Sequence, residues 1–146
     1  MLVCDLLKTK PKELICTRPG VPILEAMELL IRHKISCLPV LDEGGLVVGI
    51  ISDKDIFRRI FQDYRGFRDL TVRDLMSTNL IIGLPDDEIS YIAAIMTNNR
   101  IRHVPILEGE SLIGLLSVGD IVKTQMEDVR IENRYLWQYI TGAYPG

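Results

Sequence analysis

The sequence predicts an α/β fold made of two tandem repeats, each with the order strand, helix, strand, strand, helix. The first observation is that the chain matches itself when one half is laid on the other. The matched pairs are Pro19/Pro85, Ile23/Ile89, Ile35/Ile101, Pro39/Pro105, Gly49/Gly114, Ser52/Ser117 and Asp55/Asp120. The second is that residues 3–7 (VCDLL) match residues 72–76 (VRDLM), and that the offset changes only where loops are expected.

The elements of each repeat follow from apolar periodicity and turn residues. A short apolar run reads as a strand, and apolar residues at helical spacing come next. Each second strand contains a proline, Pro39 or Pro105, which suggests an edge or a bulge because proline cannot donate to a ladder. The expected elements are strands at 13–17, 36–42 and 47–52 with helices from 23 and 52, and strands at 79–84, 102–108 and 112–117 with helices from 89 and 117.

The expected domain organisation is repeat one at 1–61, a linker at 62–69, repeat two at 70–125 and a helical tail at 126–146. A unit of about 60 residues is small for an independent core, so we expect the repeats to pack face to face with pseudo-twofold symmetry. Some apolar helix residues could belong to this core or to the face of a homodimer, and the sequence leaves both open. They are Met27, Leu30, Met96 and Trp137.

The composition excludes several classes of function. The 146 residues carry a formal net charge of −3, and binding a phosphate backbone needs a clustered positive excess, so no nucleic acid is expected as a partner. No membrane association is expected either, because no apolar run could span a bilayer and no signal peptide is evident. The three cysteines form no CxxC pair, which favours free thiols in the cytoplasm. His33 and His103 lie at no ligand spacing from them, so no metal site is expected.

A hydroxyl and a carboxylate lie three residues apart at Ser52 and Asp55, and again at Ser117 and Asp120. Each pair falls where a strand ends and a helix begins. One interpretation is a capping box, in which the two side chains satisfy free backbone N–H groups of the first helical turn. The other is that the carboxylate binds the vicinal hydroxyls of a ribose while the helix N-terminus favours a phosphate. The two interpretations are compatible.

Four segments together resemble the cystathionine β-synthase (CBS) domain pair, also called a Bateman module. They are ISCLPVLD at 35–42, GIISDKDI at 49–56, IRHVPILE at 101–108 and GLLSVGDI at 114–121. The resemblance covers residues 3–124, and the tail looks like that of the stand-alone bacterial proteins of this family. It implies clefts between the repeats that bind an adenine nucleotide, either AMP, ADP, ATP or NAD.

The resemblance assigns roles by position. Asp55 and Asp120 would hold ribose hydroxyls, and Ser52 and Ser117 would contact ribose or phosphate. Arg102 and His103 would meet phosphates, with Lys54 as a further cation. The adenine pocket would come from residues 16–22 and 79–86 with the two strand prolines. Its named members are Cys16, Thr17, Val21, Pro22, Pro39, Asn79, Ile82 and Pro105.

The two clefts are expected to be unequal. Ser36 and Cys37 stand where repeat two has Arg102 and His103, so repeat one lacks that cationic pair. We expect a cleft built on Asp120, Arg102 and His103 to favour a phosphorylated ligand. The cleft built on Asp55 should be weaker, empty or suited to a less charged adenosine group.

The implied function is regulatory. The module would sense cellular energy or redox state through its nucleotide and act on a partner in trans by a conformational change. The alternative is a structural dimerisation or interaction module without a ligand. Catalysis is not expected, because the sequence contains no nucleophile–base pair, no metal cluster and no P-loop. A homodimer is expected under either function.

Overall fold

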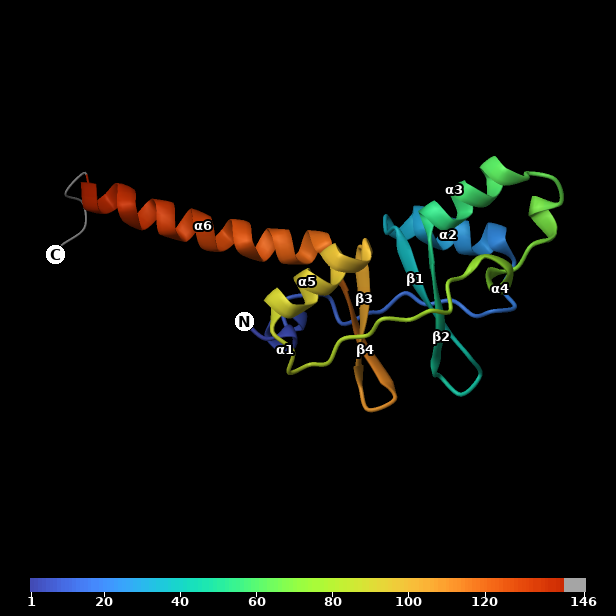
Figure 1. Cartoon of the computed structure of the whole chain (residues 1–146), viewed down its shortest axis with the longest axis horizontal. Helices are drawn as coiled ribbons and strands as arrows, with labels where there is room; N and C mark the ends of the chain where they lie inside the picture. The colour runs from blue at the N-terminus through green and yellow to red at the C-terminus, as the bar shows by residue number, and fades with distance from the viewer. Residues whose placement is uncertain (141–146) are drawn as a thin grey trace.

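The computed structural model describes residues 1–140, and from 128 onward it describes the side chains of residues 129, 130, 133, 134 and 136 alone. The trace runs through eleven elements (Figure 1). In repeat one and the linker these are α1 (Val3–Leu7), α2 (Ile23–His33), β1 (Cys37–Leu41), β2 (Val47–Ser52), α3 (Asp53–Gln62) and the 3-10 helix η1 (Phe67–Asp69). In repeat two they are α4 (Val72–Leu75), α5 (Ile89–Asn99), β3 (His103–Glu108), β4 (Ser111–Ser117) and α6 (Val118–Ile140).

Two antiparallel hairpins stand side by side in the middle of the molecule (Figure 1). Pro39 pairs with Ile50 in one hairpin, and Pro105 pairs with Leu115 in the other. In each hairpin the pairing register shifts just beyond the proline, between Val40 and Leu41 in β1 and between Ile106 and Leu107 in β3. The predicted irregularity next to the strand prolines is therefore present in both repeats.

The prediction of a first strand in each repeat is wrong, because neither segment forms a strand. At 13–17 and 79–84 the chain makes a single parallel bridge, Thr17 with Val40 and Gly83 with Ile106. The Thr17 amide donates to the Pro39 carbonyl at 2.9 Å, and the Leu41 amide donates back to Thr17 at 2.9 Å. Pro19 and Pro85 come two residues later, and because they have no N–H the ladder cannot continue through them.

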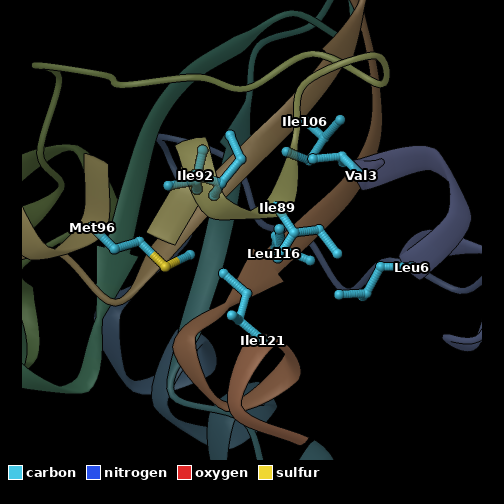
Figure 2. Packing of buried hydrophobic residues seen from close by; sticks show 9 residues of the cluster. Val3, Leu6, Ile89, Ile92, Met96, Ile106, Leu116 and Ile121 are labelled. Carbon is cyan, nitrogen blue, oxygen red and sulfur yellow. The ribbon is translucent and has the colours of Figure 1, made fainter. Parts of the chain in front are cut away.

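The two hydrophobic cores exchange their short helices. Val3 and Leu6 of α1 are buried in the core of repeat two, against residues such as Ile89 and Leu116 (Figure 2). Val72 of α4 is buried in the core of repeat one. The backbone contacts match as well, since the Val3 amide donates to the Asp87 carbonyl and the Val72 amide to Val21, each at 2.9 Å. The repeats are thus tied together by both arms, whereas the boundaries drawn along the sequence remain a prediction.

Two glycines allow the hairpins to approach these exchanged helices. A Cβ on Gly114 would lie 2.6 Å from Cδ2 of Leu7, and one on Gly49 would lie 2.7 Å from Sδ of Met76. Real Cβ contacts are essentially never this short. The same close packing therefore occurs once in each repeat, which makes the pseudo-twofold relation visible at the level of single atoms.

Of the residues considered for a dimer face, Leu30 and Met96 belong to the cores, with 6% and 3% exposure. Met27 is half-buried and packs against the core of repeat one. The side chain of Trp137 lies outside the described part of the structure. The exposed apolar surface is found elsewhere, on α2 and α3, and along α6, which extends away from the hairpins (Figure 1).

Candidate functional site

Two clefts lie between the repeats. The first, called the Asp55 cleft, has a volume of about 290 Å³; it is lined by Ser52 and Asp55 of repeat one and by residues 79–81 and 100–103 of repeat two. The second, called the Asp120 cleft, has a volume of about 850 Å³; it is lined by Ser117 and Asp120 of repeat two and by residues 10–15 and 34–37. Each acid therefore faces segments contributed by the other repeat.

Both acids take part in capping boxes at helix N-termini. The Ser52 amide donates to Oδ2 of Asp55 at 2.9 Å, and the Asp55 amide donates to Ser52 Oγ at 3.3 Å. In repeat two the corresponding distances between Ser117 and Asp120 are 2.9 and 3.1 Å. The capping interpretation is confirmed. Capping is not the whole description of the two acids, because each is half-buried and also lines its cleft.

Cations gather at the Asp55 cleft. Lys54 and Arg58 come from α3, Arg100 ends α5, and Arg102 precedes β3. All four are exposed, and none forms an ion pair within residues 1–140. The predicted grouping of Arg102 with Asp120 is wrong: the turn after α5 of repeat two reaches over the N-terminus of α3 in repeat one. Arg102 therefore lines the cleft that was expected to lack it, whereas His103 lines both clefts.

The two clefts share one wall, made of Ser36, Cys37 and His103. Ser36 Oγ lies 3.3 Å from Nε2 of His103, so the two repeats meet here through a hydrogen bond. Burial and the charge of Arg102 lower the pKa of His103 below its ordinary value, which favours the neutral imidazole near pH 7. Burial, together with the nearby Asp55 and Asp53, raises the pKa of the Cys37 thiol to about 12.

The Asp120 cleft contains an ion pair that sequence reasoning missed. Lys10 Nζ donates to Oδ2 of Asp120 at 2.6 Å and to the carbonyl oxygen of Leu115 at 2.7 Å. Burial alone would raise the pKa of Asp120, but the hydrogen bonds from Lys10 and Ser117 outweigh it and the pKa lies below its usual value. The only available signal was the match of 3–7 with 72–76, which places Lys10 opposite Asn79.

The predicted adenine-pocket residues divide into two groups. Asn79 and Pro105 line the Asp55 cleft. The others line neither of the two clefts: they are Cys16, Thr17, Val21, Pro22, Pro39 and Ile82. Apolar residues slightly earlier in the chain line the clefts instead, Leu80 and Ile81 in one and Leu14 and Ile15 in the other. Thr17 is buried, and its hydroxyl has no hydrogen-bond partner within the described residues.

Among the side chains that the structure describes, no group of three or more His, Cys, Asp or Glu could bind a metal ion. None of the described helices is both long enough and apolar enough to cross a membrane.

Comparison with known proteins shows the family. The CBS domain model matches residues 4–62 and 72–127, which is most of the chain, so this protein belongs to the CBS domain family as a tandem pair. The mitochondrial CBS domain-containing protein CBSX3 of Arabidopsis thaliana is 30% identical, over 97% of this chain and 73% of its own length. Two enzymes are also related to the chain, but the match covers 22% of each, so that the shared part is the CBS portion of a fusion.

Two solved structures of the same fold contain adenosine compounds. The CBS domain pair of protein MJ0100, in complex with 5′-methylthioadenosine and S-adenosyl-L-methionine, has a TM-score of 0.77 and 29% identity, and the match covers 88% of this chain and 98% of that one. CBSX2 in complex with AMP has a TM-score of 0.74 and 25% identity, with 86% and 96% covered. Stand-alone CBS pairs are adenosine-ligand binding modules of a regulatory kind.

Proposed function

We propose that this protein binds an adenine nucleotide in the Asp55 cleft, with AMP, ADP, ATP and NAD as the candidates. One observation carries the proposal. A half-buried carboxylate at a helix N-terminus, Asp55, shares its cleft with four exposed cations, two from each repeat. An acid beside unpaired cations fits a ligand with hydroxyls at one end and phosphates at the other.

The geometry suggests how the nucleotide lies. Asp55 accepts hydrogen bonds from the ribose hydroxyls, as the acid of other nucleotide sites does. Arg100 and Arg102 bind the phosphates through their forked donors, and His103, being neutral, contributes a hydrogen bond rather than a charge. The adenine ring packs against the apolar side chains of Leu80 and Ile81. The volume of about 290 Å³ lies at the lower end of the range for small-molecule sites.

The regulatory role extends this proposal. The ligand lies between two repeats that exchange helices, so binding adjusts the position of one repeat relative to the other, and a partner protein recognises the change. The candidate signals are cellular energy, for adenosine phosphates, and redox state, for NAD. The thiols of Cys4, Cys16 and Cys37 are all free, which is consistent with action in the reducing cytoplasm.

A second candidate function is dimerisation without a ligand, and the exposed apolar surface of repeat one favours it. Ile31 on α2 is 75% exposed, and Phe57 and Phe61 on α3 are 75% and 86% exposed. A groove of about 400 Å³ runs between the two helices. We propose that this surface packs against a second copy of the chain. A homodimer is compatible with both functions, and nucleotide binding distinguishes them.

The test of the nucleotide site is Asp55→Ala, measured by calorimetric titration with AMP, ADP, ATP and NAD. We expect the affinity of the best ligand to fall by at least about tenfold, because hydrogen bonds to a charged acceptor are worth roughly 1.5–3 kcal/mol. The matched control is Asp74→Ala. Asp74 caps α4 in the same way, accepting from the Thr71 amide at 2.8 Å, but lies outside both clefts. Unchanged affinity in the Asp55 variant would reduce that residue to a cap, and a wild-type protein that binds none of the four would favour the structural module.

A further inference from the structure

The two clefts carry the same acid but differ in the residue that faces it. Asn79 lines the cleft of Asp55, and Lys10, which matches Asn79 when residues 3–7 are laid on 72–76, lines the cleft of Asp120. Asn79 is exposed and makes no side-chain hydrogen bond within residues 1–140. Lys10 is half-buried, and its ammonium is held at two points inside the Asp120 cleft. The pseudo-twofold symmetry of the fold is thus broken at Oδ2 of Asp120, which an ammonium group contacts in one cleft only.

We propose that Lys10 acts as an internal ligand of Asp120 and thereby ranks the two clefts. The inference rests on the proposed function, since it assumes that an acid in each cleft binds ribose hydroxyls. A hydroxyl that approaches Oδ2 of Asp120 meets an ammonium already 2.6 Å away. Displacing it breaks a charge-assisted hydrogen bond and frees the Leu115 carbonyl. Asp55 has no such competitor among the described residues, because its carboxylate is engaged by the groups of Ser52 alone.

The two clefts should therefore fill in order. A nucleotide enters the Asp55 cleft at low concentration, and the Asp120 cleft binds only ligands able to displace Lys10. This ordering reverses the expectation from the sequence, in which the Asp120 cleft is the stronger one. Size does not decide it, because the weaker cleft is the larger, about 850 Å³ against about 290 Å³.

The test is Lys10→Asn, which gives the Asp120 cleft the residue of the other cleft. Calorimetric titration with AMP and with ATP is expected to show one tight site per chain in the wild type. In the variant, the affinity of the Asp120 cleft should rise by about tenfold or more over the wild type, so that a second site becomes measurable. The sign is diagnostic. Removing a positive charge weakens the binding of an anion by general electrostatics, whereas loss of a competitor strengthens it.

Two controls separate these effects. Lys12→Asn removes the same charge from the same cleft, but Lys12 is exposed and does not contact Asp120, so the second site should not tighten. Lys10→Arg keeps the cation and should bind as the wild type does. The reciprocal Asn79→Lys places an ammonium opposite Asp55 and should weaken the tight site.

The outcomes distinguish this inference from the proposed function. Two equal sites in the wild type, or no tightening in Lys10→Asn, overturn the role of Lys10 while the nucleotide site stands. If the wild type binds no nucleotide but the Lys10→Asn variant binds one, the role of Lys10 is supported and the Asp55 site is overturned. If neither protein binds AMP or ATP, both proposals fail. Thermal unfolding of each variant confirms that it is folded.

Discussion

At the scale of single residues, this molecule uses the same side chains for folding and for the candidate site. Asp55 and Asp120 cap helices and also line clefts, so the motif alone could not separate the two roles. The sequence could identify both acids because the pattern occurs twice. It could not identify Lys10, because a lysine in a loop has no periodicity, and its contact with Asp120 joins residues more than a hundred positions apart.

His103 gives a prediction about pH. Burial and Arg102 lower the pKa of its imidazole in the folded protein. At pH values below the ordinary pKa of 6.5, the unfolded chain therefore takes up a proton at His103 more readily than the folded one. We expect the free energy of unfolding to decrease as the pH falls from 6.5 toward the folded pKa, and His103→Gln to flatten this dependence. NMR titration of the imidazole checks the pKa directly. Phosphate bound beside the ring should raise it, and a pKa unmoved by saturating ATP would contradict the placement of phosphate at His103.

At the scale of elements, the ends of α2 and α5 position cations at the clefts. Lys34 and Arg100 end these helices in the left-handed conformation, each with φ of 54°. The amides of Ile35 and Ile101 close the turn by donating to Leu30 and Met96. Glycine would adopt this conformation without strain, so the sequence accepts a cost in stability at both ends. The benefit is a cation over each cleft, Lys34 in one and Arg100 in the other.

Replacing these two cations by glycine separates stability from binding. We expect Arg100→Gly to gain up to about 1 kcal/mol of stability by relief of left-handed strain, which raises Tm by roughly 2–4 °C. The same variant should bind nucleotide more weakly at the tight site, because one phosphate ligand is lost. Lys34→Gly relieves the same strain at the other cleft and should leave the tight site unchanged. Calorimetric titration measures the affinity of each variant. If both variants lose affinity equally, the phosphates lie at the wall that the two clefts share.

At the scale of the whole molecule, the arrangement across the clefts was the part that sequence could not supply. Self-matching pairs each residue of one repeat with a residue of the other, so the twofold relation could be predicted. The order helix, strand, strand, helix that starts at α2 and at α5 could be predicted too. It does not show that the turn at Arg102 reaches the acid of the other repeat, because that depends on how the repeats pack. The first strand predicted for each repeat is wrong for a local reason. An apolar run such as NLIIGL at 79–84 fits the pattern of a strand, but it pairs with the hairpin only through the single bridge at Gly83.

The exchange of α1 and α4 predicts that the two repeats unfold together. Each core is closed by a helix from the far side of the sequence, so opening one core withdraws the arm that completes the other. Leu6 is 2% exposed in the core of repeat two, and Leu6→Ala should cost about 2–5 kcal/mol. Hydrogen exchange of the slowest amides in β1 and in β3 should then accelerate by the same factor, roughly 30-fold or more. Tyr91→Ala, at a site 55% exposed on α5, is the control and should leave both hairpins nearly unchanged. If only β3 accelerates, the repeats are independent units, and a nucleotide between them would have no cooperative structure through which to signal.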